Sequence, residues 1–567
     1  MKHFSNFFNW PHWSVVTMWV VPILLVIPNI VLDITEPHYS LPARLTNLFL
    51  PLGVYLLLTS WNRQVGRTVV LMVPIMIFCA FQIVLLFLYG ESIIAIDMFL
   101  NVMTTNTKEA SELLRNLVLA IVLVVVLYLP PIVVGSVIWI RGAGTKHPQR
   151  VRGRIAGIVL AAVGLMTMVI AMGHSAGYRI TRQLFPVNVV SNMVESVHRT
   201  IRTADYFKTS EHFTFDAHSS RPEHMPEVYV LVIGETSRAD NWQLFGYDRP
   251  TNPRLSQRSN LIVFPKALSE SNTTHKSVPL LLTPLSSFEF GDSIYTTHSV
   301  MDAFNESGYA TAWISHQGRN RSFIEFFASQ AQSVDFIDDD QQLHTDMDLA
   351  THLRDYLAGT TRDKVFVVLH TYGSHFNYHE RYPAEYAHFV PDNSTEAKSA
   401  NRDQLINAYD NTIRYTDAVL DSIINVLDHS GRPAAMLYLS DHGEDIFDDS
   451  RGRFLHASPT PTYWQIHVPM LMWMSDSYRQ AFPGAYEQAW KNKDLNVSSS
   501  AATFHTLVNL AGIHTPYLDT TGALSSADYR EPRRVYLNDY NEGVELTSSG
   551  LRPIDISSLK SKNISRD

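Results

Sequence analysis

Long apolar segments separated by short polar ones occupy the first 175 residues of the chain. Five of them are each close to the roughly 20 residues that a helix needs to cross the hydrocarbon core of a bilayer. They lie near residues 13–33, 45–61, 68–89, 117–140 and 155–173. Their internal prolines agree with this interpretation, because neighbouring helices can satisfy the freed carbonyl groups. The pattern predicts a domain of five transmembrane helices over residues 1–175.

The charges of the short loops predict an orientation for these helices. Arg63 and Arg67 lie between the second and third segments, and residues 141–154 are rich in Lys and Arg and contain no acid. Loops of this kind stay on the cytoplasmic side of the membrane. Five spans then leave the long remainder of the chain outside, in a periplasm or its equivalent.

The remainder of the chain has a different pattern. Residues 176–227 mix apolar and basic positions at helical spacing before a polar stretch, which indicates an interfacial helix and a linker. Over residues 228–550 strand-like runs alternate with helical patterns; the runs are VYVLVIG, LIVFPKAL, TAWISHQ, KVFVVLHT and AMLYLSD. This alternation predicts an α/β domain with a mostly parallel central sheet covered by helices. The polar tail, residues 551–567, is expected to be disordered.

Composition excludes several classes of function. With 567 residues the chain is too long for one domain, and with 46% hydrophobic content it is too apolar at one end for a soluble protein. Its one cysteine, Cys79, lies in the third apolar segment, so no intrachain disulfide can stabilise the outer domain. Nucleic-acid binding is not expected, because the outer domain has no stripe of basic residues. The apolar segments carry almost no charged residues of the kind that line a transport pathway.

Polar residues follow the predicted strands where these end. Glu235 follows one apolar run, and Asp441 and His442 follow another in the motif SDHGED. Open α/β sheets bind ligands at this edge. Three further polar segments belong to the same set: LSESNTTHKSVP, VVLHTYGSHFNYHERYP and RFLHASP. Carboxylate and imidazole ligands without thiolates suit zinc or manganese, which can convert a hydroxyl into a nucleophile.

These motifs, in this order, resemble a known family. Glu-Thr after an apolar strand, GYDRPTNP, a Thr five residues before a Pro, GSH, RYP and SDHGE are similar to the membrane phosphoethanolamine transferases of the alkaline phosphatase and sulfatase superfamily. The resemblance covers nearly the whole chain. It implies a multi-pass enzyme of the bacterial inner membrane with its sulfatase-like catalytic domain in the periplasm. The implied donor is phosphatidylethanolamine, and the implied acceptor is a lipopolysaccharide or a periplasmic glycan.

The resemblance also implies a nucleophile and a metal site. Thr274 is the implied nucleophile, which forms a covalent phospho-threonine, and Thr273 and Ser277 are the alternatives. The implied ligands of a catalytic zinc ion are Glu235, Asp441, His442 and the Thr274 oxygen. Manganese is the alternative metal.

Further residues are assigned to the substrate. His375 and His456 are implied to face the phosphate, where they exchange protons or bind a second metal ion. His370 and His379 flank the same strand end, and we expect each to satisfy a nearby backbone group. The residues expected to contact the donor are Gln317, Arg319, Asn106 and Glu109, the last two in a segment that could also be a capped helix.

The chain departs from the lipid A modifying members of that family in having no disulfide-forming cysteines in the outer domain. In this respect it resembles the branch that acts on core heptose or on periplasmic glucans, so the acceptor stays open among these and lipid A. Two other functions also stay open. One is a phosphoglycerol transferase of the lipoteichoic acid synthase type, and the other is an inactive membrane scaffold.

Overall fold

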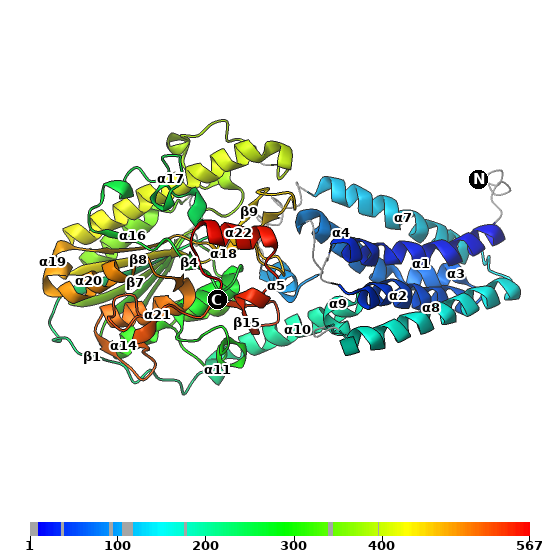
Figure 1. The fold of residues 1–567 in the computed structure, drawn as a ribbon, viewed down its shortest axis with the longest axis horizontal. Helices are drawn as coiled ribbons and strands as arrows, with labels where there is room; N and C mark the ends of the chain where they lie inside the picture. Colours follow the sequence, from blue (N-terminus) through cyan, green and yellow to red (C-terminus); the bar gives the residue numbers. More distant parts are fainter. Residues whose placement is uncertain are drawn as a thin grey trace. The chain divides into compact units, whose positions relative to one another are not determined.

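Two compact units make up the chain (Figure 1). The first comprises residues 1–198 with 449–453, and the second comprises residues 199–448 and 454–567. The computed structural model describes residues 10–35, 39–89, 94–104, 117–174, 178–337, 344–394 and 396–567.

Long apolar helices form the first unit. They are α1 (Trp10–Thr35), α2 (Leu41–Trp61), α3 (Val65–Leu71), α4 (Val73–Tyr89), α5 (Ile96–Thr104), α7 (Val118–Ile140) and α8 (His147–His174). Among the described residues, four helices are long and apolar enough to cross a membrane, and α3 with α4 makes a fifth if this pair, bent by 52°, is one span. Pro74 accounts for the bend, because it has no N–H and its ring crowds the preceding turn. The predicted set of long apolar helices is confirmed, and the bent pair takes the place of the third predicted span.

Small residues let α2 and α8 pack closely. A Cβ atom at Gly53 would lie 2.4 Å from the backbone nitrogen of Ala161, and one at Gly164 would lie 2.5 Å from that of Leu50. Helices in a membrane associate largely through such close packing, because lipid is as apolar as their side chains.

Three helices follow the last apolar helix: α9 (Ile180–Gln183), α10 (Val187–Ala204) and α11 (Tyr206–Thr209). Exposed apolar side chains recur along α10 at helical spacing; they are Val187, Val190, Met193, Val194, Val197 and Ile201. This pattern is typical of a helix at a membrane surface. The interfacial role of α10 stays a prediction.

A seven-stranded sheet forms the centre of the second unit, in the order β3-β11-β8-β2-β7-β5-β6. Its strands are β2 (Glu227–Gly234), β3 (Leu261–Val263), β5 (Ala310–Ser315), β6 (Ser333–Phe336), β7 (Lys364–His370), β8 (Ala434–Ser440) and β11 (Met470–Met474). Strands β8, β2, β7, β5 and β6 are parallel, and β11 runs antiparallel to both β8 and β3. The predicted mostly parallel sheet is confirmed.

Helices cover both faces of this sheet. Figure 1 shows α16 (Met347–Gly359) and α17 (Arg402–His429) on one face and α14 (Val300–Glu306) and α21 (Ser499–Leu510) on the other. All eight residues of the central strand β2 are buried. Strands buried on both faces are continuous apolar runs, which is the pattern of residues 228–233.

Shorter elements complete the second unit. The helices are α12 (Thr274–Leu282), α13 (Phe290–Ser293), α15 (Phe323–Ala328), α18 (Tyr463–Ile466), α19 (Asp476–Ala481), α20 (Pro483–Asn492) and α22 (Pro553–Ser561). The strands are β1 (His218–Ser219), β4 (Ala267–Leu268), β9 (Asp445–Ile446), β10 (Phe454–Leu455), β12 (Val497–Ser498), β13 (Ile513–His514), β14 (Val535–Leu537) and β15 (Gly543–Glu545).

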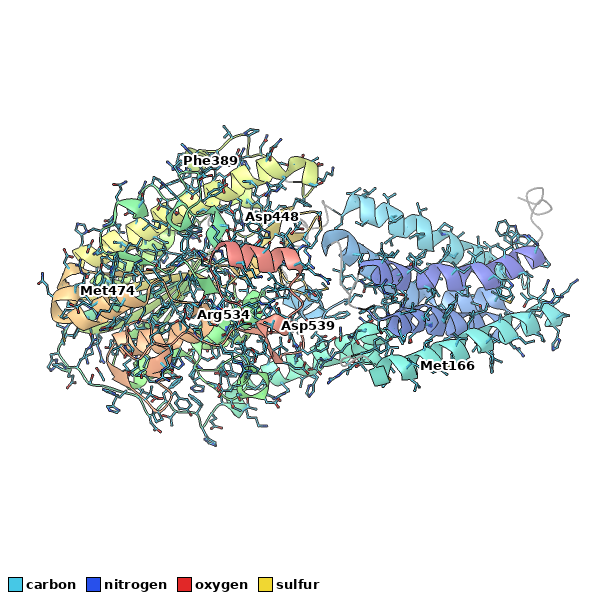
Figure 2. All side chains as sticks on the ribbon, in the orientation of Figure 1. Met166, Phe389, Asp448, Met474, Arg534 and Asp539 are labelled. Atoms are coloured by element: carbon cyan, nitrogen blue, oxygen red, sulfur yellow. The ribbon has the colours of Figure 1, made fainter. Side chains whose placement is uncertain are left out.

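The expectation of a disordered tail is wrong. Residues after Leu551 form α22, and Leu559 and Ile564 are buried in a small apolar cluster with α18. The guanidinium of Arg534, labelled in Figure 2, donates to the carbonyls of Lys266 at 2.9 Å and Ser565 at 3.3 Å. Two apolar side chains and these hydrogen bonds order a segment whose polar composition alone predicts disorder.

Candidate metal and phosphate site

Sheet register brings the predicted metal ligands together. Strands β2 and β8 are parallel neighbours with Gly234 opposite Ser440, so the next residues, Glu235 and Asp441, leave the sheet side by side. Nε2 of His442 lies 3.6 Å from Oε1 of Glu235 and 3.3 Å from Oδ2 of Asp441. One ligand atom from each of the three residues lies within 4.8 Å of the others. We call Glu235, Asp441 and His442 the ligand cluster.

The hydroxyl of Thr274 meets this cluster at the start of α12. Its Oγ1 lies 3.2 Å from Oε1 of Glu235 and 3.1 Å from Nε2 of His442. The alternatives have other partners: Ser277 donates to the Thr273 carbonyl at 2.7 Å, and the Thr273 hydroxyl lies 3.3 Å from that of Ser271. A helix N-terminus also favours a negatively charged group beside it. Thr274 is therefore the hydroxyl best placed to attack a phosphate bound here.

The ligand cluster fits a divalent cation. Nδ1 of His442 donates to the carbonyl of Gly443 at 2.9 Å, which leaves the Nε2 lone pair facing the two carboxylates. Oδ2 of Asp441 is buried and has no hydrogen-bond partner among the described residues. Burial and the nearby charge of Glu235 raise the pKa of Asp441 well above its usual value. A cation here would relieve this repulsion, and two carboxylates with one imidazole are ligands that such a metal accepts.

His375 and His456, which we call the histidine pair, lie beside the ligand cluster. The ring of His456 is 4.2 Å from that of His442 and 6.1 Å from that of His375, between ring centres. Nδ1 of His375 donates to the carbonyl of Phe376 at 2.7 Å. Burial, followed by the neighbouring histidines, lowers the pKa of His456 well below its usual value. His456 is therefore a neutral imidazole in the folded protein.

Of the residues expected to contact the donor, Gln317 lies at the cluster. Its side-chain amide donates to Oε2 of Glu235 at 3.0 Å and to the carbonyl of Thr371 at 2.9 Å, so it orients the Glu235 carboxylate. Arg319 instead lies 3.6 Å from Glu325 and over the ring of Phe336. The two remaining predicted contacts, Asn106 and Glu109, lie outside the described residues.

The two histidines at the end of β7 differ from each other. Both ring nitrogens of His370 are buried and have no hydrogen-bond partner among the described residues, so the expectation that it satisfies a backbone group is wrong. It packs against Trp313, and burial lowers its pKa to about 4. His379 is exposed and lies 3.5 Å from Asp392, a side chain rather than a backbone group.

Sequence analysis missed Glu444, which supports the histidine pair. Its buried carboxyl lies 3.4 Å from Nδ1 of His456 and accepts a hydrogen bond from the Tyr378 hydroxyl. Burial raises the pKa of Glu444 well above its usual value. The signal that could have revealed it is its place two residues after His442 in the motif SDHGED.

Known proteins match the part of the chain that carries this site. The sulfatase family model matches residues 227–513, half of the chain. Phosphoethanolamine transferase EptA of Escherichia coli (strain K12) is 31% identical over 316 residues, which is 53% of this chain and 57% of that protein. Kdo(2)-lipid A phosphoethanolamine 7''-transferase of the same strain is 28% identical over 317 residues, 54% of each chain. The chain thus spans about half the length of these curated relatives.

Two solved structures extend the comparison. The membrane protein lipooligosaccharide phosphoethanolamine transferase A (EptA) from Neisseria meningitidis has a TM-score of 0.71 at 21% identity, and the match covers 91% of this chain and 99% of that one. It shares the fold of both units. The C-terminal periplasmic domain of EcEptC from Escherichia coli, solved in complex with Zn, has a TM-score of 0.53 at 25% identity and covers 58% of this chain and 95% of that one.

These matches confirm the resemblance. The relatives carry the name phosphoethanolamine transferase, and the matched segment contains the ligand cluster, Thr274 and the histidine pair. Since the family model covers half of the chain, including the whole parallel sheet that carries the site, the chain belongs to the sulfatase family.

Proposed function

We propose that this protein is a metal-dependent phosphoethanolamine transferase. It would move phosphoethanolamine from phosphatidylethanolamine to a lipopolysaccharide or a periplasmic glycan. The observation that carries the proposal is the approach of the Thr274 hydroxyl to both Glu235 and His442 at the edge of the sheet. The names of the relatives support the transferred group.

Zinc is the proposed metal. Glu235, Asp441 and His442 would hold it together with the Thr274 oxygen, and the zinc complex of the EcEptC domain supports this choice over manganese. When bound, zinc would lower the pKa of the hydroxyl and offset negative charge on the phosphate. The histidine pair is the proposed place of a second metal ion, if there is one.

The first half-reaction uses Thr274 as the nucleophile. Its hydroxyl hydrogen points to Glu235, which leaves an oxygen lone pair for attack on the phosphorus of the donor. A bond forms from Oγ1 to phosphorus, and the bond from phosphorus to the glycerol oxygen breaks. Diacylglycerol leaves once that oxygen gains a proton, which balances the proton that the Thr274 hydroxyl releases as it attacks. A phosphoethanolamine ester of Thr274 remains.

The second half-reaction returns Thr274 to its starting state. His456, whose ring centre lies 4.2 Å from that of His442, would accept the proton of an acceptor hydroxyl as that oxygen attacks the phosphorus. The bond from phosphorus to Oγ1 breaks, and the threonine oxygen recovers the proton that His456 accepted, so that His456 is neutral again. His375 would hydrogen-bond to the phosphate oxygens during both halves.

We propose that the first unit keeps this chemistry at a membrane. A donor lipid presents its headgroup at the membrane surface, so an enzyme anchored by apolar helices stays close to its substrate. We propose the bacterial inner membrane and an outer, periplasmic second unit, because residues 141–154 are basic without acids. The exposed apolar face of α10 is consistent with contact with lipid.

Transfer by the full chain in vesicles tests the proposal. The chain is incubated with zinc, phosphatidylethanolamine and purified lipopolysaccharide, and the acceptor is analysed by mass spectrometry. We expect a gain of one phosphoethanolamine that is lost in Thr274→Ala and kept in the matched control Ser277→Ala. Transfer of phosphoglycerol from phosphatidylglycerol would favour the synthase type instead. No transfer from either lipid, together with no bound metal, would favour the inactive scaffold.

A further inference from the structure

The turn that carries His375 is held by one buried carboxylate. Oδ1 of Asp346 accepts a hydrogen bond from the N–H of Tyr372 at 2.8 Å, and Oδ2 accepts one from the N–H of Gly373 at 2.9 Å. Asp346 is 5% exposed. Two consecutive backbone groups, three and two residues before His375, are therefore bound to one side chain.

His316 completes the arrangement around this carboxylate. Its Nδ1 donates to Oδ1 of Asp346 at 2.7 Å. His316 follows β5, whose last residue, Ser315, is opposite His370 of β7, so the turn and the imidazole start from neighbouring strands. Burial alone would raise the pKa of Asp346, but the hydrogen bond and charge of His316 and the two N–H groups lower it. Asp346 is thus an anion that accepts all three hydrogen bonds.

The other side of the turn lies against a metal ligand. The N–H of Ser374 donates to the backbone carbonyl of Glu235 at 3.0 Å. Gly373 has a φ of +58°, and a Cβ atom on it would lie 2.6 Å from that same carbonyl oxygen. The turn therefore fits between Asp346 and the backbone of Glu235 with no room for a side chain at Gly373.

Gln317 makes a second link between these strand ends. Gln317 directly follows His316, and its amide joins Oε2 of Glu235 to the carbonyl of Thr371. Gln317 therefore holds Glu235 through hydrogen bonds of its own, which neither Asp346 nor His316 makes. The hydrogen bonds connect three adjacent strand ends, those of β5, β7 and β2.

We infer that Asp346, oriented by His316, is a positioning residue that fixes His375 relative to the ligand cluster. The inference rests on the proposed function, in which His375 faces the phosphate. Asp346 itself does not touch the reacting atoms. Its effect on transfer passes through His375, and this distinguishes it from a residue that only stabilises the fold.

Asp346→Asn tests the inference. Asparagine keeps one acceptor oxygen but turns an NH₂ group toward one of the donors. Displacement of a catalytic group by about 1 Å can cost about 10²-fold in rate, so we expect a loss of about that size, with bound zinc unchanged. In a His375→Ala background the same change should cause less than about a two-fold further loss, because the positioned group is gone. Equal losses in both backgrounds, or no loss in the wild-type background, would overturn the inference.

Asp417→Asn is a matched control. Asp417, on α17, is also buried and accepts hydrogen bonds from two consecutive backbone N–H groups, those of Arg254 and Leu255, each at 2.9 Å. We expect Asp417→Asn to lower Tm and to leave transfer per folded molecule unchanged. If Asp346→Asn does not fold, His316→Phe removes the third hydrogen bond. Its loss of transfer, about ten-fold, should also disappear in the His375→Ala background, and an undiminished loss there would contradict the inference.

Hydrogen–deuterium exchange of the full chain in detergent separates this inference from the proposed function. Peptides that cover residues 371–376 should exchange faster in Asp346→Asn than in the wild type, and at the wild-type rate in Asp417→Asn. Absence of transfer by the wild-type protein with every donor lipid would refute the proposed function, while faster exchange would still support the role of Asp346 in holding the turn. Unchanged exchange would overturn that role whatever the activity.

Discussion

The ligand cluster and the histidine pair lie beside each other but are positioned in different ways. Glu235 and Asp441 directly follow two adjacent parallel strands, so sheet register alone sets them side by side. His375 lies on a turn five residues past the end of β7, and His456 follows the short strand β10. The comparison teaches that a metal site can be specified by register, whereas the residues around it need buried contacts to hold them.

The two groups also differ in charge. The cluster places two carboxylates within reach of one cation, while the histidine pair is supported by the buried, proton-retaining carboxyl of Glu444. A cation would therefore stabilise the first group, and proton exchange with the acceptor is the role that we propose for the second. Substitutions in the ligand cluster and in the histidine pair should therefore differ in their effects on bound metal and on transfer.

The largest expected effect is that of Asp441→Asn. It removes one metal ligand, so we expect transfer to fall by at least about 10⁴-fold, because nucleophile activation and charge stabilisation are lost together. Metal content, measured on the purified full chain by mass spectrometry, should fall with it. A variant that kept both metal and transfer would break the distinction between the two groups.

Without metal, Asp441→Asn should stabilise the folded protein. The raised pKa of Asp441 means that its ionised form is unfavourable in the folded protein. This loss of folding stability is therefore absent below about pH 4, the pKa of an Asp side chain in the unfolded chain, and it appears as the pH rises above that value. In chelator we expect Asp441→Asn to have a higher Tm than the wild type at pH 7 and an equal Tm near pH 4. Added zinc should raise the Tm of the wild type far more than that of the variant.

His456→Ala should have the next largest effect. Loss of a positioned proton acceptor costs about 10²-fold or more in rate, whereas the four proposed zinc ligands all remain. We therefore expect zinc content equal to that of the wild type and an accumulation of the Thr274 ester, since the second half-reaction is slowed. Partial loss of zinc from His456→Ala would instead indicate a second metal ion at the histidine pair.

Gln317→Leu should have a smaller effect. Removal of a group that orients a metal ligand costs about 10- to 100-fold in metal affinity, and saturating zinc should restore most of the transfer. Arg319→Ala is the matched comparison from the same segment, with Arg319 facing Glu325. It should leave zinc affinity unchanged. Equal effects of the two substitutions on zinc affinity would contradict the assigned role of Gln317.

Leu559→Ala should have no effect on transfer per folded molecule. Leu559 is 1% exposed in the cluster that joins α22 to α18, and a buried Leu→Ala change costs about 2–5 kcal/mol of unfolding free energy. Thermal unfolding followed by circular dichroism measures this loss. An unchanged Tm would mean that the C-terminal segment contributes no stability.

Much of the ligand cluster could be predicted from sequence because the signal is local. An apolar run that stops at Glu235, and another that stops at Asp441 and His442, place these residues at one sheet edge as soon as both runs are taken as parallel strands. The choice of Thr274 over Thr273 and Ser277 came from the resemblance. Its geometric support, a hydroxyl that meets the cluster, needs the folded chain.

Other features were beyond sequence analysis because they depend on distant contacts. The hydrogen bond from Gln317 to Glu235 follows from the order of β2, β7 and β5, which periodicity does not reveal. The carboxylate of Asp346 reaches a turn that lies 26 residues later in the chain. The helical tail depends on Leu559 and Ile564, two apolar residues that a polar composition conceals.

The most direct test of the account is the intact mass of the full chain after incubation with zinc and phosphatidylethanolamine without an acceptor. Peptide mapping of the adduct then identifies the residue that carries it. The account predicts a gain of one phosphoethanolamine on Thr274, absent from Asp441→Asn. In a parallel incubation with an acceptor, the adduct should be more abundant in His456→Ala than in the wild type. An adduct on Thr273 or Ser277, or transfer to an acceptor without any adduct on the protein, would contradict it.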